Sequence, residues 1–154
     1  MIEYLDLHIH SHYSAATSPK NDMRNINQVS KNKGITILGT GDILHEAYLK
    51  ECKDVLKYNK QINLYEFNGM KYILTTEVCN IFKVDGITKK IHTIICIPTF
   101  EDVDMIRDIL GKYSNLQSDG RPQFNLDCQL FVGLIKDKIP EAVIIPAHVW
   151  TPWF

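Results

Sequence analysis

Asp6-Leu7-His8-Ile9-His10 is the stretch that decides how this chain folds around a site. Residues 3–9 have the short aliphatic pattern of a strand, in which successive side chains leave opposite faces. His8 and His10 then share one face with Asp6, and the aliphatic spacers face a core. An acid and two imidazoles are costly to bury without a partner, and a metal ion is such a partner. The alternative is a polar edge strand with exposed histidines.

Further metal-capable side chains stand in or beside other aliphatic strands. They are Asp42 after Ile35–Leu38, Glu77 near the end of Tyr72–Val78, His92 within Ile91–Ile97 and His148 after Ala142–Pro146. Because active sites of α/β proteins collect at the carboxyl ends of strands, these side chains are expected to converge. With the histidine pair, they predict a polynuclear metal site.

The segments between these strands predict helices and turns. A helix over 22–33 would begin at Asn21 or Asp22 and end at Gly34. Asp85-Gly86 predicts a tight turn after the strand 81–84. Other helices are expected over 45–59, 101–113 and 127–138, and polar loops over 11–20 and 114–125. Because strands alternate with helices, the sequence favours an α/β domain with a mainly parallel sheet or barrel.

The composition of the 154 residues is that of an ordinary soluble domain, with 45% hydrophobic and 23% charged residues. A net charge of -1 excludes a global basic field that would attract nucleic acid, so an anionic substrate must be met locally. The four cysteines form no C-x-x-C pair, which favours reduced thiols in a cytoplasmic protein. No signal peptide or membrane span is expected, and no oligomeric state is indicated.

A resemblance to a known family rests on the motifs around these residues. The D-x-H-x-H start and the segment GITILGTGD at 34–42 resemble the PHP (polymerase and histidinol phosphatase) superfamily. Four further segments are similar to the branch that contains endonuclease Q. They are ILTTEV at 73–78, KIHTIICIP at 90–98, NLQSDGRP at 115–122 and VIIPAHVWTPWF at 143–154. The resemblance covers nearly the whole chain.

The resemblance implies a distorted (β/α)7 barrel and two or three divalent metal ions (zinc, manganese or magnesium). His8, His10 and Glu77 would hold one ion, and Glu77 would bridge to a second held with His92 and His148. Asp42 would help hold a third. These are also the residues to which the catalytic role is assigned.

The family completes its site with an Asp-x-His pair on a later strand, and no such pair follows His148. The resemblance therefore implies a partial barrel, the N-terminal part of a longer one, that lacks ligands of the complete site. The activity implied for the branch is hydrolysis of DNA on the 5′ side of deaminated bases such as hypoxanthine and uracil, by a metal-activated hydroxide.

Substrate-binding roles are expected for Arg121, Asp119 and Trp150. Arg121 could grip a phosphate with its planar guanidinium, but Asp-Gly and Arg-Pro are equally typical of a surface turn that includes Asp119. Trp150 and Trp153 could stack on an unstacked base, or at least one of them could pack in the barrel.

Four polar residues near the site are expected to play supporting parts. His12 and His45 are expected to be solvated or to stand behind the ligands rather than bind metal. Ser11 and Ser14 most simply cap turns.

Three functions remain open from the sequence. The first is a DNA-repair endonuclease, whose partner is DNA with deaminated bases. The second is a small-molecule phosphatase of the histidinol-phosphatase kind, because those enzymes share the superfamily's metal residues. The third is an inactive metal-binding fragment or interaction module, since a partial barrel leaves strand edges unpaired.

Overall fold

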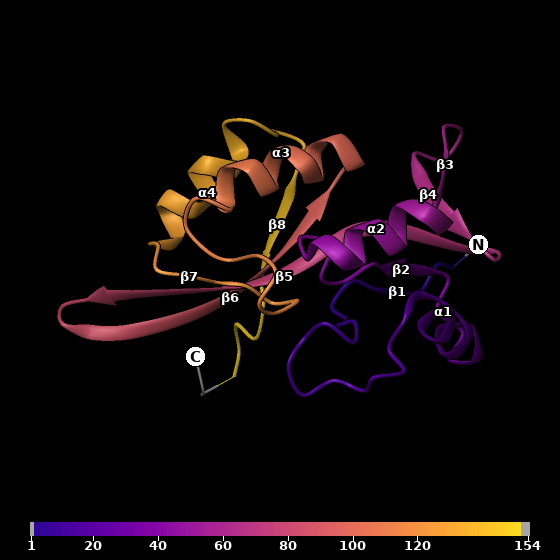
Figure 1. The fold of residues 1–154 in the computed structure, drawn as a ribbon, viewed down its shortest axis with the longest axis horizontal. Coiled ribbons are helices and arrows are strands. Elements are labelled where there is room, and N and C mark those ends of the chain that lie inside the picture. The colour runs from indigo at the N-terminus through magenta and orange to yellow at the C-terminus, as the bar shows by residue number, and fades with distance from the viewer. Residues whose placement is uncertain (1, 152–154) are drawn as a thin grey trace.

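Residues 2–151 are described by a computed structural model, in which an eight-stranded sheet is combined with four helices (Figure 1). In chain order the elements are β1 (Leu5–Asp6), α1 (Met23–Asn32), β2 (Ile37–Gly39), α2 (Glu46–Val55), β3 (Lys57–Asn59), β4 (Leu64–Phe67), β5 (Met70–Val84), β6 (Ile87–Ile97), α3 (Phe100–Leu110), β7 (Gln123–Phe124), α4 (Cys128–Lys136) and β8 (Val143–Pro146). The predicted α/β class is confirmed.

The sheet is mixed rather than mainly parallel. β1, β2 and β5 run parallel, as expected, but β6 is antiparallel to both β5 and β8. The cause is the predicted turn, because Asp85 (φ 50°) and Gly86 (φ 79°) form a two-residue connection that joins only antiparallel strands. The strands predicted at 72–78 and 81–84 are one continuous strand, β5.

A short strand replaces the end of a predicted helix. The helix expected over 45–59 ends at Val55, and Lys57–Asn59 forms β3, which pairs with β4. Tyr58 lies opposite Tyr65 across this pair, and aromatic residues fit a pleated surface better than a helix. Pairing with β4 therefore makes Lys57–Asn59 a strand, although the sequence pattern of residues 45–59 predicts a helix.

Close backbone contact shapes the segment after β1. The strand predicted over residues 3–9 ends at Asp6, so His8 and His10 stand beyond it. There the chain crosses the end of β2 so closely that a Cβ on Gly39 would lie 2.9 Å from the Leu7 carbonyl oxygen. Gly41 has φ 65°, and a Cβ there would lie 2.4 Å from the Ile9 carbonyl oxygen. Glycine at both positions lets the two segments pack with backbone against backbone.

Three of the four helices in residues 2–151 have side-chain N-caps, and the buried apolar residues form one hydrophobic core cluster. Asp22 caps α1, as predicted, Asp127 caps α4, and Thr99 with Asp102 forms a capping box on α3. The largest fully buried side chains include Tyr48, Tyr72, Phe124 and Phe131. Figure 1 shows α2 beside the end of the sheet that carries β1 and β2, and α3 and α4 beside β8. None of the helices in residues 2–151 has the length and apolarity that crossing a membrane requires.

Candidate metal centre

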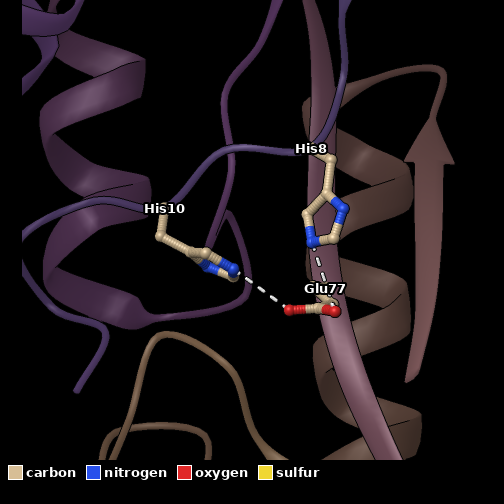
Figure 2. A group of neighbouring side chains, drawn as sticks. All are labelled: His8, His10 and Glu77. Carbon is tan, nitrogen blue, oxygen red and sulfur yellow. Dashed lines mark ion pairs between the residues drawn. The ribbon is translucent and has the colours of Figure 1, made fainter. Parts of the chain in front are cut away.

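Glu77 is the centre of the histidine cluster. Its side chain is 1% exposed, and its Oε1 lies 3.2 Å from His8 Nε2 and 3.0 Å from His92 Nδ1. The same oxygen is 3.2 Å from His148 Nε2, whereas Oε2 is 3.0 Å from His10 Nε2. Figure 2 shows His8 and His10 pointing at the two oxygens of Glu77 from the segment that follows β1. One carboxylate thus faces four imidazoles.

The cluster divides into two sets of possible ligands that share Glu77. The first group is His8, His10 and Glu77, and the second group is Glu77, His92 and His148. Within each group the nitrogen and oxygen atoms that could hold an ion lie within 4.8 Å of one another. A carboxylate common to two groups is the arrangement that a bridging ligand needs.

The ligands reach the centre from four parts of the sheet. His8 and His10 follow the carboxyl end of β1, and His148 follows β8 with φ 58°. Glu77 and His92 lie inside β5 and β6, where the register pairs Cys79 with His92. The expectation that Glu77 lies near a strand end is therefore wrong, because β5 runs on to Val84. The antiparallel hairpin brings Glu77 and His92 together without a strand end.

Asp42 lies behind His10 and outside both groups. Its fully buried carboxylate is 2.9 Å from His10 Nδ1 through Oδ1. Oδ2 accepts hydrogen bonds from the Ser11 amide (2.6 Å), the Ser11 hydroxyl (2.7 Å) and the Ser14 hydroxyl (2.9 Å). Carboxylates behind a metal-binding imidazole commonly fix its tautomer and orientation. The contact of Asp42 with His10 Nδ1 has this arrangement, and Asp42 itself has a left-handed backbone with φ 44°.

The carboxylates shift the protonation of the cluster. The hydrogen bond with Asp42 and the ion pair with Glu77 raise the pKa of His10 to about 9, although burial opposes this. Burial favours the neutral form of Glu77, but its ion pairs with His10 and His8 outweigh burial and hold the Glu77 pKa well below its ordinary range. Burial is the main cause that lowers the pKa of His92. Without an ion, a proton on His10 therefore balances part of the negative charge of Asp42 and Glu77.

The donor set fits a divalent metal ion. Glu77 Oε2 is a buried oxygen that accepts no well-formed hydrogen bond within residues 2–151, despite its short distance to His10 Nε2. A buried carboxylate oxygen with this deficit is a site for a cation. Imidazole nitrogen and carboxylate oxygen together suit zinc, manganese or iron.

The other expected residues lie at different distances from the centre. Arg121 is near it, with its guanidinium 3.6 Å from Glu77 Oε2 and one third exposed. Asp119 instead accepts the Arg121 amide in a turn (2.8 Å), and Trp150 is 96% exposed. Trp153 lies outside the described residues. The histidines expected to be supporting residues, His12 and His45, are in neither group.

Three supporting residues were missed or undervalued from the sequence. Ser11 and Ser14 do more than cap turns, because both hydroxyls donate to Asp42. Gly120 packs against the same carboxylate, and a Cβ there would lie 2.5 Å from Asp42 Oδ2. The available signal was the position of Ser11 directly after the histidine pair. Nothing local in the sequence places Gly120 beside Asp42.

The fold structurally matches endonuclease Q, as the sequence motifs indicated. The chain superposes on the crystal structure of the lesion-specific endonuclease PfuEndoQ from Pyrococcus furiosus with a TM-score of 0.85 and 34% identity over 99% of its length. It matches endonuclease Q in complex with a 27-mer duplex that carries an abasic lesion at the active site with a TM-score of 0.81 and 34% identity over 97% of its length.

These relatives are longer than the chain. It spans 36% and 35% of the two solved chains. It is also 33% identical over 153 residues to an uncharacterized protein of Methanocaldococcus jannaschii, of which it spans 17%. No protein-family model matches the chain.

Proposed function

We propose that this chain carries the metal-binding part of a DNA endonuclease that cuts beside damaged bases. The observation that supports the proposal most directly is the buried Glu77, shared by two groups of histidines. A carboxylate that bridges two cations is a recurrent device of phosphoesterases, because both ions then act on one phosphate. The likeness to endonuclease Q supports DNA as the substrate.

The roles of the residues follow from their positions. His8 and His10 with Glu77 would hold one ion, and His92 and His148 with Glu77 a second. A divalent cation there supplies Lewis acidity and an activated water for attack on phosphorus at neutral pH. Asp42 keeps His10 in the tautomer whose Nε2 faces the centre. A third ion at Asp42 would have to replace some of its hydrogen bonds to Ser11 and Ser14.

Substrate contacts are assigned to the residues around the cluster. Arg121 lies between Glu77 and solvent, so its guanidinium can meet a phosphate oxygen as the substrate arrives. Asp119 shapes the turn that presents Arg121. Trp150 offers an exposed ring on which a splayed base can stack. The family resemblance makes hypoxanthine and uracil the expected lesions.

The test combines metal analysis with a nicking assay. The purified chain is loaded with manganese, magnesium or zinc and incubated with duplexes that carry one deoxyinosine, one deoxyuridine, one abasic site or no lesion. We expect bound metal, a nick on the 5′ side of a lesion, and loss of both in Glu77→Gln. Bound metal without a nick in any duplex would refute the endonuclease proposal but support the metal site. Absence of both metal and nick would refute both proposals.

A further inference from the structure

The outer part of the β5–β6 hairpin stands apart from the rest of the described fold. β7 reaches β5 only at Cys79 and Asn80, and β8 reaches β6 only from Thr93 onward. Among residues 2–151, the segment 81–91 therefore has only its own two strands for pairing. Figure 1 shows this ribbon extending beyond the helices and the other strands. A two-stranded ribbon has little stability of its own, and every residue from Lys83 to Lys90 is exposed.

Three lysines make this ribbon positive. Lys83, Lys89 and Lys90 are exposed, and none of them forms an ion pair within the described part of the chain. The only acid in the segment 81–91 is Asp85, in the turn. In a chain whose net charge is -1, the ribbon is a local concentration of positive charge.

Two of the lysines share a face with the cluster. Glu77 and Lys83 are an even number of residues apart on β5, so their side chains leave the same face. Thr88 is the partner of Lys83, and Lys90 follows it by two residues on β6, so Lys90 joins that face. The register runs without a bulge from Leu74 to Val84, which preserves this alternation along the ribbon.

The third lysine lies on the opposite face. Lys89 pairs with Phe82, one step out of phase with Lys90.

We propose that Lys90 and Lys83 form a track for the phosphates of a DNA strand that leads outward from the Glu77 cluster. This inference rests on the proposed function. Neighbours two residues apart on a strand are about 6.8 Å apart, and diagonal neighbours across a pair about 7–8 Å. A DNA strand carries one phosphate per about 3.4 Å of its axis, so each lysine can meet a separate phosphate. A two-stranded ribbon also fits the major groove of B-DNA.

The test uses adjacent lysines on opposite faces. Lys90→Gln and Lys89→Gln remove the same charge one residue apart. Binding of a labelled duplex with one abasic site is measured by fluorescence anisotropy in the presence of manganese, over a series of salt concentrations. Lys90→Gln should weaken binding. It should also make the negative slope of log affinity against log salt less steep by about 0.7–0.9, the value for one lost phosphate contact. Lys89→Gln should leave this slope unchanged, and Lys83→Gln with Lys90→Gln should make it less steep by roughly 1.4–1.8.

Three results would overturn the track. Equal losses in Lys90→Gln and Lys89→Gln would show attraction to overall charge alone, and a wild-type chain that does not bind the duplex would leave no track. Nicking is measured on the same samples, with metal content and circular dichroism as controls for the cluster and the fold. Wild-type nicking without a difference between the faces would sink the track and keep the endonuclease. Binding that depends on Lys90, with no nick in any duplex, would support the track and refute the endonuclease activity.

Discussion

The two groups around Glu77 are positioned by different means. In the first group, Asp42 fixes His10, and the hydroxyls of Ser11 and Ser14 fix Asp42. In the second group, His92 is set by the ladder between β5 and β6, and His148 follows β8, whose pairing with β6 brings it close. The first group thus depends on a network of side chains, and the second on the pairing of strands. Substitutions should therefore affect the two groups separately, except at Glu77.

The largest effect is expected at the residue that both groups share. Glu77→Gln removes the charge that both ions would share, so metal content should fall close to zero. The loss of metal affinity should exceed the roughly 10–100-fold loss that follows removal of a residue hydrogen-bonded to a metal ligand. Metal per chain is measured by mass spectrometry after gel filtration. Glu101→Gln, at an exposed acid of α3, is the control, and retention of metal by Glu77→Gln would refute the shared role.

The next effect separates the two groups. His8→Ala should lose the ion of the first group and keep that of the second, whereas His148→Ala should do the opposite. Each variant is therefore expected to keep about half of the wild-type metal, because each leaves one complete set of ligands. Loss of all metal in either variant would mean that the cluster holds a single ion.

Asp42→Asn should weaken the first group alone. Asn tolerates the left-handed backbone at this position and keeps the shape of the side chain, but it no longer offers a charged acceptor to His10. Metal affinity of the first group should fall by about 10–100-fold, measured by titration calorimetry on the His148→Ala background. Ser14→Ala, which removes one hydrogen bond to Asp42, should give a smaller loss. An equal loss in the second group, measured on the His8→Ala background, would contradict the separation.

The groups should also differ in pH dependence. His10 has a pKa raised to about 9, so an ion of the first group must displace its proton at neutral pH. Its apparent affinity should increase between pH 6.5 and 9. His92 has a lowered pKa, so the second group should respond less over this range. In the metal-free chain the stabilisation by protonated His10 is complete below pH 6.5 and is lost as pH rises through about 9. Parallel pH profiles for the two groups, measured by metal titration, would contradict this expectation.

The smallest effect concerns a glycine next to the first group. Gly120→Ala would press a Cβ against Asp42 Oδ2 and Ser14 Oγ, so we expect a loss of about 1–3 kcal/mol in the free energy of unfolding. Gly133→Ala is the matched control, because no atom lies within 4 Å of a Cβ there. Since Gly133 is inside α4, this change should stabilise by about 0.5–1 kcal/mol. Equal melting temperatures for both variants would mean that the segment around Gly120 yields easily.

The sequence predicted those features that local chemistry determines. The cap of α1, the Asp85-Gly86 turn and the α/β class followed from local residue types and patterns. The motifs likewise indicated endonuclease Q, whose structures the chain matches. These features need few contacts between distant segments, which is why a single sequence is enough to predict them.

The remaining features depend on contacts across the chain. The segment after β1 packs closely against Gly39, and β3 pairs with β4. No periodicity reveals either contact. Similarly, the hydrogen bonds of Asp42 to two serines required the fold, because an acid after a strand looks the same whether it binds an ion or orients a histidine. The sequence predicted which residues gather and could not rank their roles.

The position of Glu77 in the chain has a consequence for folding kinetics. His8 lies far before it and His148 is 71 residues after it, whereas the hairpin makes His92 a near neighbour. A cation held at Glu77 would therefore act as a cross-link that closes two long loops at once, where loop-closure entropy is large. Chelation should then speed unfolding and expose the segments that carry His8 and His148 to proteases. A bound cation would thus stabilise contacts between segments far apart in the sequence, which are the contacts that form slowly during folding.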